Sequence, residues 1–307
     1  MEVTVPSLLD GVRVDRAVAL LAGVSRATAA ELVERGAVEL DGRPVTTRSA
    51  PLRAGASLSV ALPETAEQIV EAEPDVVVPV VAEDEDVIVV DKPPGLVVHP
   101  GAGRERGTLV AGLLARYPEL SELPAAGLGD PARPGIVHRL DRGTSGLLVV
   151  ARSARAYRSL TEQLAARQVH RRYLALVAGI VADERGVVDA PLGRSTRQPT
   201  KMAVVAGGRE ARTAYRVLGR DEGPPPVSLL SLELETGRTH QIRVHLSAIG
   251  HPVVGDDLYG RPDGRLAEGR LFLHSTELSF AHPADGRPVG FESPLPEDLA
   301  ALVPGGG

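Results

Sequence analysis

Residues 135–150 read Gly-Ile-Val-His-Arg-Leu-Asp-Arg-Gly-Thr-Ser-Gly-Leu-Leu-Val-Val. The last four residues, 147–150, form an apolar run of the type found in strands. A dense polar turn precedes this run and contains a single carboxylate, Asp141, with an arginine close to it on each side. Glycines within the turn permit sharp backbone geometry. The stretch predicts a loop that carries an isolated carboxylate and leads into a strand, although a solvated turn between two strands would have a similar composition.

The length of the chain, 307 residues, suits one large domain and one small domain. A hydrophobic content of 43% is enough for a buried core, and 24% charged residues indicate a soluble surface. Apolar stretches fall short of the roughly 18 residues that span a bilayer. Acidic residues interrupt the N-terminal region, which therefore lacks the pattern of a signal peptide. We expect a cytoplasmic protein without a membrane partner.

The chain contains no cysteine, which excludes disulfides, thiol catalysis and thiolate metal sites. Nearly all of its basic residues are arginines, which suit phosphates and stacked bases, although a GC-rich genome gives the same bias. The net charge is −6, so a nucleic-acid partner has to meet a local basic patch. Aromatic residues make up only 3% of the chain, which argues against extensive base stacking.

Residues 1–63 are expected to form a small separate α/β domain. Apolar residues with helical spacing occur between 12 and 33, and the glycine at 36 ends the second helix. Residues 38–40 then read as a strand that is followed by an Asp-Gly hairpin turn. Residues 64–78 carry five acidic side chains around a proline and are interpreted as an acidic linker.

The second domain is expected to span residues 79–304. Its helical and strand patterns do not alternate strictly, which favours an α+β fold with a mostly antiparallel mixed sheet over a doubly wound fold. The predicted strands are 87–90, 96–98, 173–179, 213–218 and 229–234, and the predicted helices include 154–167 and 239–249.

Several common kinds of active site do not fit this sequence. His240 and His245 are five residues apart and lie on different helical faces, so no metal-binding pair is expected. Ser145 lacks the glycine spacing of the hydrolase nucleophile turn. Paired glycosidase carboxylates need a second acid, whereas the central stretch supplies only Asp141.

Three segments remain that carry residues suited to one site. They are the loop with Asp141, the predicted strand that opens near Tyr173, and the segment 235–246 with Arg243. Taken alone, Tyr173 is also typical of packing at a strand end, and Arg243 is also typical of a surface or capping arginine. Their grouping therefore needs a further argument.

Resemblance to a known family supplies that argument. The run 138–141, followed by 144–149, resembles the catalytic-loop motif of the RluA/RluD-type pseudouridine synthases, in which Asp141 would be the essential aspartate. The segments around Tyr173 and Arg243 follow in the order that this family shows. Further matching segments are 91–100, 250–256, 258–260, 273–274 and 282–283. Departures are mild: Arg142 stands where lysine is commoner, and Asp257 where proline is commoner.

Residues 1–63 resemble an S4 RNA-binding module, with two short helices followed by a strand pair. This resemblance implies that Arg26 and Arg35 on the second helix lie along RNA phosphates, together with arginines at 43, 48 and 53. Glutamates at 31, 34 and 39 make this basic face thinner than is usual for the module. A generic small α/β unit with a solvated surface is the alternative.

The family resemblance implies conversion of uridine in RNA to pseudouridine. This isomerisation involves no redox change and no net water, so no cofactor or metal is expected. Asp141 would attack the sugar or the base, Arg243 would keep it ionised through an ion pair, and Tyr173 would stack on the base and take a proton from the sugar. The residues expected to contact RNA beside the target uridine are Arg139, Arg142 and Arg238.

Other functions stay open at this point. A non-catalytic RNA-binding protein could keep the same scaffold, and a nucleoside hydrolase or glycosidase is a third class. The overall layout resembles the enzymes that act on large-subunit ribosomal RNA, but a tRNA substrate is also open. We expect a monomer.

Overall fold

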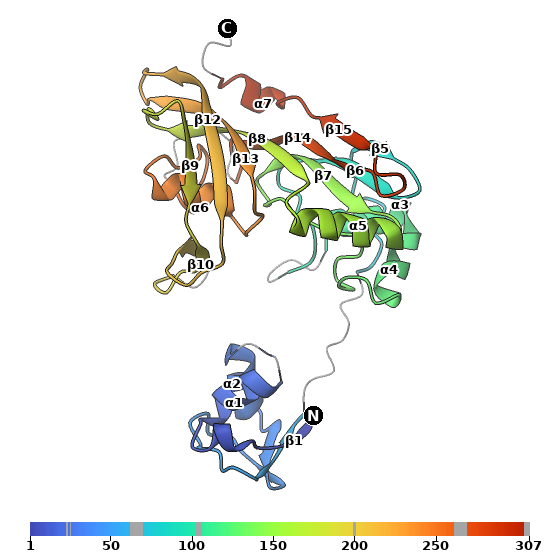
Figure 1. Cartoon of the computed structure of the whole chain (residues 1–307), viewed down its shortest axis with the longest axis vertical. Coiled ribbons are helices and arrows are strands. Elements are labelled where there is room, and N and C mark those ends of the chain that lie inside the picture. The colour runs from blue at the N-terminus through green and yellow to red at the C-terminus, as the bar shows by residue number, and fades with distance from the viewer. Residues whose placement is uncertain are drawn as a thin grey trace. The chain divides into compact units, whose positions relative to one another are not determined.

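The structure, a computed structural model, describes residues 1–303 except 23, 25, 62–69, 102–105, 199–200 and 261–268, and excepting the side chains of Arg26 and Ala27. The chain forms two compact units, Met1–Gln68 and Ile69–Gly307 (Figure 1). The second unit therefore starts ten residues before the predicted domain start at 79. Residues 64–69 of the predicted linker and the predicted limit at 304 lie outside the described residues.

The first unit is a small α/β fold. Its strands form an antiparallel sheet in the order β1-β4-β2-β3, and the Asp-Gly turn predicted from the sequence joins β2 to β3. Asp41 and Gly42 both have positive φ, 48° and 74°, which this tight turn requires. The elements are β1 (Glu2–Thr4), η1 (Ser7–Leu9), α1 (Val14–Leu21), α2 (Arg26–Glu34), β2 (Val38–Leu40), β3 (Arg43–Pro44) and β4 (Ser57–Val60).

A large mixed sheet forms the second unit and confirms the predicted α+β class. The strands follow the order β5-β6-β7-β14-β8-β13-β12-β9, with β15 paired to β14, and only β7 and β14 run parallel among the described strands. Their bounds are β5 (Val80–Glu83), β6 (Val87–Lys92), β7 (Ser145–Ala151), β8 (His170–Ala178), β9 (Arg185–Asp189), β12 (Arg212–Asp221), β13 (Val227–Leu234), β14 (Leu273–Ala281) and β15 (Pro288–Glu292). A separate hairpin consists of β10 (Leu192–Arg194) and β11 (Met202–Val204).

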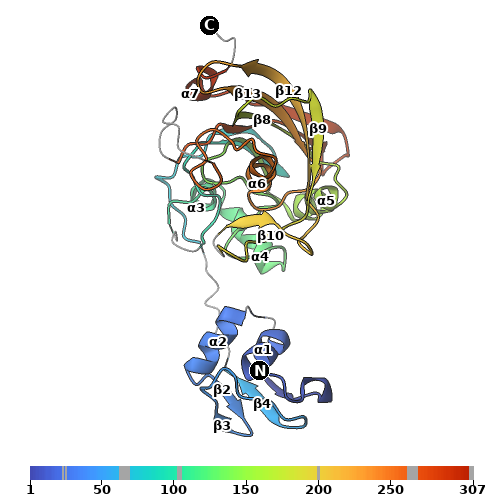
Figure 2. The same cartoon turned by 90° about the vertical axis from the view of Figure 1, so that its left-hand side faces the viewer.

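The helices of the second unit are short. Figure 2 shows α6 on the concave side of the curved strands β8, β12 and β13. The described helices are α3 (Leu109–Arg116), η2 (Pro118–Ser121), α4 (Glu122–Ala125), α5 (Ala154–Ala165), α6 (Gln241–Ala248) and α7 (Glu297–Ala300). In the part of the chain that the structure describes, none of the helices has the length and apolarity to cross a membrane.

The predicted strand at 96–98 is wrong. Val97 makes only an isolated bridge, to Thr108. The carbonyl oxygens of Val97 and Val98 instead accept hydrogen bonds from the backbone N–H groups of Leu109 and Val110, at 2.9 and 3.0 Å. The first N–H groups of a helix have no partner inside the helix. The apolar run at 96–98 therefore satisfies the start of α3 and does not extend the sheet.

Residues 70–78, within the predicted acidic linker, lie against α3. The backbone N–H of Glu73 donates to the carbonyl oxygen of Ala111 at 2.9 Å. Gly112 permits this approach, because a Cβ atom there would lie 2.4 Å from the carbonyl oxygen of Val76. The segment begins with a valine at 70 and ends with three valines at 76–78. The packing of Val70 and Val78 against the main core holds the segment on the second unit.

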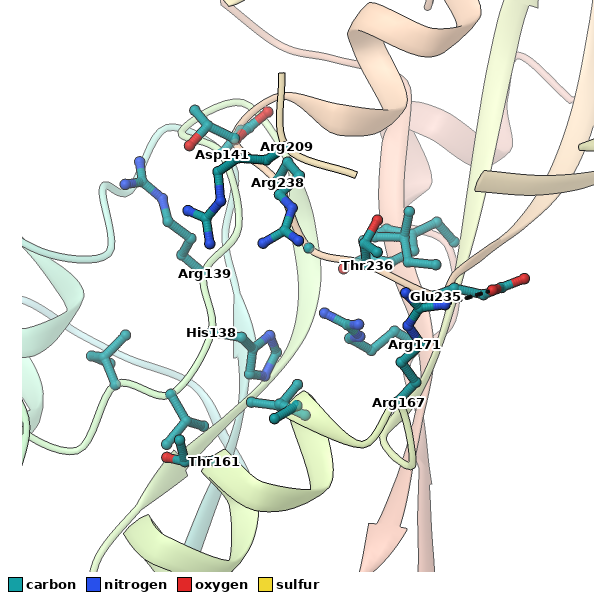
Figure 3. Close-up of a pocket in the computed structure, with 18 of the residues that line it drawn as sticks. His138, Arg139, Asp141, Thr161, Arg167, Arg171, Arg209, Glu235, Thr236 and Arg238 are labelled. Carbon is teal, nitrogen blue, oxygen red and sulfur yellow. Dashed lines mark hydrogen bonds and ion pairs between the residues drawn. The ribbon is translucent and has the colours of Figure 1, made fainter. Parts of the chain in front are cut away.

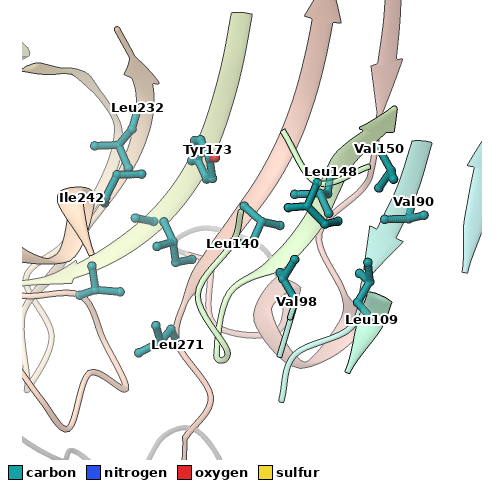
Figure 4. Packing of buried hydrophobic residues seen from close by; sticks show 14 of the residues in the cluster. Val90, Val98, Leu109, Leu140, Leu148, Val150, Tyr173, Leu232, Ile242 and Leu271 are labelled. Carbon is teal, nitrogen blue, oxygen red and sulfur yellow. The ribbon is translucent and has the colours of Figure 1, made fainter. Parts of the chain in front are cut away.

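The main core of the second unit anchors the loop that carries Asp141. Leu140, the preceding residue, is 4% exposed and belongs to the same buried cluster as Leu148 of β7 and Tyr173 of β8 (Figure 4). Full burial of one leucine side chain contributes about 1.5–3 kcal/mol. The carboxylate at 141 is therefore attached to a fixed point of the core.

Candidate active site

Asp141 lies in the loop immediately before β7. Its carbonyl oxygen accepts a hydrogen bond from the backbone N–H of Thr144 at 3.1 Å, which closes a tight turn. Gly146 follows with φ of 108°, and a Cβ atom there would lie 2.3 Å from the carbonyl oxygen of Ser275 in β14. A glycine is therefore required where the loop joins the parallel strand pair β7–β14.

Arg243 joins Asp141 to a second carboxylate. Its Nη1 lies 3.2 Å from Oδ2 of Asp141, while its Nε and Nη2 donate to the two oxygens of Asp256 at 2.7 and 2.9 Å. The side chain of Asp256 is fully buried, and those of Arg243 and Asp141 are 10% and 14% exposed. The guanidinium group is therefore fixed by Asp256 and offers its remaining edge to Asp141.

The charges of this cluster stabilise one another. Burial raises the pKa of Asp256, but the hydrogen bonds and charge of Arg243 outweigh it and hold this pKa below its ordinary value. Burial lowers the pKa of Arg243, and the two carboxylates outweigh that effect and raise it. Arg243 therefore stays a cation beside Asp141 over the whole range in which proteins function.

Tyr173 completes the group of residues that the sequence analysis singled out. It comes from β8, is 4% exposed, and lines the same small cavity as Asp141 and Arg243. Burial raises the pKa of the Tyr173 phenol, so it keeps its proton at neutral pH. The structure thus brings together an acid from a loop, a cation from α6 and an aromatic ring from a central strand.

A larger groove of about 590 Å³ opens from Asp141 and Tyr173. Figure 3 shows Arg139 on the wall that precedes β7 and Arg171 on the opposite wall. Further arginines at 133, 167, 209 and 238 line the groove, against the carboxylates of Asp141 and Glu235. The local charge is therefore strongly positive although the net charge of the chain is −6.

The arginines of the groove differ in their partners. Arg167 pairs with Glu210 at 2.6 Å and with Glu235 at 3.4 Å. Arg139, by contrast, makes no ion pair with any other residue that the structure describes, and its side chain is exposed. Arg238 donates from Nε to the carbonyl oxygen of Glu210 and keeps its charge unpaired among the described acids. Arg171 and Arg209 likewise have no ion pair among the described residues, but Arg139 and Arg238 also line the small cavity with Asp141, so these two are best placed to bind an anion beside it.

Two other predicted RNA contacts lie elsewhere. Arg142 is exposed and donates from Nε to the carbonyl oxygen of Gly95 at 3.4 Å, so the structure does not bring it to the groove. Arg35 in the first unit forms an ion pair with Glu31 one helical turn away, which offsets part of its charge. The side chain of Arg26 lies outside the described residues.

Sequence reasoning did not assign a role to Asp256, which stands in one of the matching C-terminal segments. The signal was the Gly-Asp pair 13 residues after Arg243, but only the fold shows that the two side chains meet. His240, three residues before Arg243, and Tyr259, three residues after Asp256, also meet beside Asp141, with Nδ1 of His240 2.8 Å from the Tyr259 hydroxyl. Within the described residues, no cluster of three or more acidic or histidine side chains is arranged to hold a metal.

Lys92 is a further buried charge near the site. Its side chain is fully buried, and Nζ donates to the carbonyl oxygens of Pro93 and Leu96 at 2.9 Å and of Arg142 at 3.3 Å. The ammonium group thus ties the turn after β6 to the residue that follows Asp141. Burial lowers the pKa of Lys92 to about 7, although the charge of Asp141 works in the opposite direction.

The stability of the protein should rise with pH because of Lys92. Between about pH 7 and the ordinary lysine value of about 10.4, the unfolded chain binds more protons at this residue than the folded chain. Folding therefore gains up to about 1.4 kcal/mol per pH unit in this range. Urea unfolding from pH 7 to 9.5 should show the rise in the wild type and a weaker one in Lys92→Met. Equal slopes in the two proteins would contradict the burial of this charge.

Comparisons with known proteins agree with this geometry. The family model for RNA pseudouridylate synthase matches residues 86–248, and the model for the S4 domain matches residues 12–58. The ribosomal large subunit pseudouridine synthase D of Nitrosomonas europaea is 44% identical over 99% of this chain and 87% of its own length. An uncharacterized RNA pseudouridine synthase of Chloroflexus aurantiacus is 48% identical over 98% of this chain and 92% of its own length.

A solved structure shows the same fold. The human RNA pseudouridylate synthase domain containing 1 superposes with a TM-score of 0.57 and 30% identity, covering 75% of this chain and 89% of its own. The family model covers more than half of the chain, and the sequence relatives cover almost all of it. With its S4 domain at the front, the chain therefore belongs to the RNA pseudouridylate synthase family.

Proposed function

We propose that this enzyme converts uridines of large-subunit ribosomal RNA to pseudouridine, with Asp141 as the nucleophile. The observation that carries the proposal is the shared cavity of Asp141, Tyr173 and Arg243, which opens into a basic groove. The RNA class is supported by the names of several relatives, which are ribosomal large subunit pseudouridine synthases. A tRNA substrate is the alternative that the experiment below distinguishes.

The reaction breaks the bond between N1 of uracil and C1′ of ribose, rotates the base, and joins C5 to C1′. The hydrogen on C5 leaves as a proton and N1 gains one, so atoms balance without water or an oxidant. Arg243 binds Oδ2 of Asp141 at 3.2 Å, whereas Oδ1 accepts no hydrogen bond from the described residues. We assign the attack to Asp141 and the stacking contact with the detached base to the ring of Tyr173.

The target uridine has to leave its helix or loop to reach Asp141. Flipping costs a few kcal/mol, which contacts to the flanking phosphates and to the base offset. Arg139 and Arg238 are the proposed phosphate contacts, because they have no acidic partner among the described residues and line both the groove and the small cavity of Asp141. The S4 domain supplies a second RNA contact. A cytoplasmic location and a monomeric state remain predictions.

The role of Arg139 can be tested against Arg167, which lines the same groove but is paired with two acids. Arg139→Ala should raise KM about tenfold and reduce the salt dependence of RNA binding by about one phosphate contact. Arg167→Ala should change both quantities less. Steady-state assays measure KM, and RNA-binding titrations at salt concentrations from about 50 to about 300 mM measure the salt dependence of both variants. Equal effects of the two substitutions would contradict the assignment.

Incubation of the purified protein with large-subunit ribosomal RNA and with tRNA tests the function itself. We expect pseudouridine in the ribosomal RNA, detected by nuclease digestion and mass spectrometry. Pseudouridine in tRNA alone would move the substrate class to tRNA. Release of free uracil would identify a hydrolase. Unchanged RNA would indicate a non-catalytic RNA-binding protein.

A further inference from the structure

His240 occupies an unusual position between Asp141 and the loop after α6. It is the residue before the first turn of α6 and has φ of 56° and ψ of 22°, in the left-handed region. Histidine is one of the few residues with a side chain that enter this region several times more often than others. The conformation turns the imidazole ring so that its two nitrogens face different partners. Nδ1 lies 2.8 Å from the hydroxyl of Tyr259, and Nε2 lies 4.0 Å from Oδ1 of Asp141.

Tyr259 is itself fixed on several sides. Its hydroxyl oxygen accepts the backbone N–H of Met202 at 3.0 Å, and its ring lies 5.1 Å from the guanidinium carbon of Arg243. The carbonyl oxygen of Tyr259 accepts a hydrogen bond from the hydroxyl of Ser247 at 2.8 Å. The ring of His240 meets that of Tyr259 edge to face, with centroids 5.6 Å apart.

This arrangement selects one tautomer of His240. The Tyr259 oxygen already accepts a hydrogen bond from Met202, so its own proton needs an acceptor, and Nδ1 of His240 is within reach. A neutral imidazole that accepts at Nδ1 carries its proton on Nε2. The N–H donor at Nε2 therefore faces Oδ1 of Asp141, the oxygen that Arg243 does not bind.

We propose that His240, locked by Tyr259 with its proton on Nε2, is a positioning residue that directs Oδ1 of Asp141 towards the reacting uridine. The proposal rests on the function proposed above. A separation of 4.0 Å is too long for a hydrogen bond, and a small rotation of the carboxylate as the substrate enters closes it. Arg243 then holds one oxygen of Asp141 and His240 the other.

The protonation state of His240 sets the pH at which this arrangement operates. The charged groups that face its ring are Asp141 and Arg139 from the loop before β7, Arg243 from α6, and Asp256 from the loop after α6. Burial lowers the pKa of His240, against the opposing charge of Asp141, so the ring is neutral at pH 7. A protonated ring would form an ion pair with Oδ1 and compete with its attack. Activity should therefore fall on the acid side as His240 gains its proton.

Two substitutions at 240 separate positioning from a structural role. Asparagine tolerates the left-handed backbone and places an amide near the position of Nδ1, but it lacks a group at the position of Nε2. Glutamine reaches that position with an N–H donor that cannot be protonated. We expect His240→Asn to lower kcat between about tenfold and a hundredfold with KM unchanged, and His240→Gln to stay within about fivefold of wild type.

The pH profile provides a readout that a structural role would not move. In His240→Gln the acid limb of kcat should shift to lower pH, because the donor no longer titrates. Tyr259→Phe keeps the ring beside Arg243 but removes the hydroxyl, and it should lower kcat about three- to tenfold. Asp257→Asn is the control, since it changes an exposed residue of the same loop that contacts neither His240 nor Tyr259. It should leave kcat and its pH profile unchanged.

The possible results are distinct. Wild-type kcat in His240→Asn, or a glutamine variant no better than the asparagine variant, would overturn the proposal. If circular dichroism shows that His240→Asn does not fold, Tyr259→Phe becomes the test of the proposal. A wild-type kcat and pH profile in Tyr259→Phe would then overturn the proposal. A wild-type protein that makes no pseudouridine would refute the proposed function. An active wild-type enzyme whose kcat does not change on substitution of His240 would refute only the role of His240.

Discussion

Asp141→Asn is expected to lower kcat for pseudouridine formation by about 10⁴-fold or more, while RNA binding stays within about threefold of wild type. Asparagine has the same shape as aspartate but carries no charge and is a poor nucleophile. The groove arginines that bind RNA are untouched by the change. Single-turnover assays of pseudouridine formation measure the rate, and filter binding at the same salt concentration measures affinity.

The fold of this variant should survive, because Arg243 keeps both of its hydrogen bonds to Asp256. Asp257→Asn is the matched control, since it makes the same chemical change at an exposed residue next to Asp256. It should retain wild-type turnover. Residual turnover of Asp141→Asn within tenfold of wild type would refute the role of Asp141 as nucleophile.

Arg243→Met is expected to lower the free energy of unfolding by about 3–5 kcal/mol. The reason is Asp256, whose side chain is fully buried and would lose its cation. Breaking a buried ion pair from one side leaves an uncompensated charge, which costs more than the pair itself contributes. Activity should fall as well, because Asp141 loses the cation beside Oδ2. Urea unfolding at pH 7 measures the loss of stability.

The loss should depend on pH with a defined sign. In the wild type the pKa of Asp256 is lowered, so its contribution is present above the unfolded value of about 3.9 and is lost only as the pH falls through the folded value. In Arg243→Met the burial of Asp256, which raises its pKa, is opposed only by the backbone N–H groups of Leu258 and Tyr259, so we expect this pKa to rise. The variant should therefore lose stability as the pH rises from about 4.5 to 7, where the wild type does not lose stability from this residue.

The double variant Arg243→Met, Asp256→Leu is the control for this prediction. Replacing both members of a buried pair by apolar side chains of similar size is often neutral for stability. The double variant should therefore regain most of the lost stability but none of the activity. A single variant that loses less than about 1 kcal/mol would show that Asp256 is not the buried charge described here.

The sequence predicts the central features of this protein because they are local or belong to ordered motifs. The loop within residues 135–150, the strand that ends this stretch and the α+β class need only hydrophobic patterns and turn residues. Residues 96–98 show where such patterns fail. An apolar run reads as a strand, but whether it finds a neighbouring strand or the start of a helix depends on tertiary contacts.

Pairings between distant side chains are the part that the sequence cannot supply. The order of residues does not show that Asp256 accepts hydrogen bonds from Arg243, or that Tyr259 contacts His240 and orients it towards Asp141. Charge state is equally hidden, because Arg139 and Arg167 look alike in sequence and only the fold places two acids beside Arg167. The predicted helix at 239–249 begins at Gln241 because His240 is left-handed.

The most direct test of the catalytic role of Asp141 is a pseudouridine map of large-subunit ribosomal RNA from three strains. The first lacks this gene, the second carries the wild-type gene in its place, and the third carries the Asp141→Asn variant at equal expression. We predict that defined uridines are isomerised only in the second strain. Restoration of the same pseudouridines by Asp141→Asn would contradict the mechanism, since the reaction would then proceed without the carboxylate.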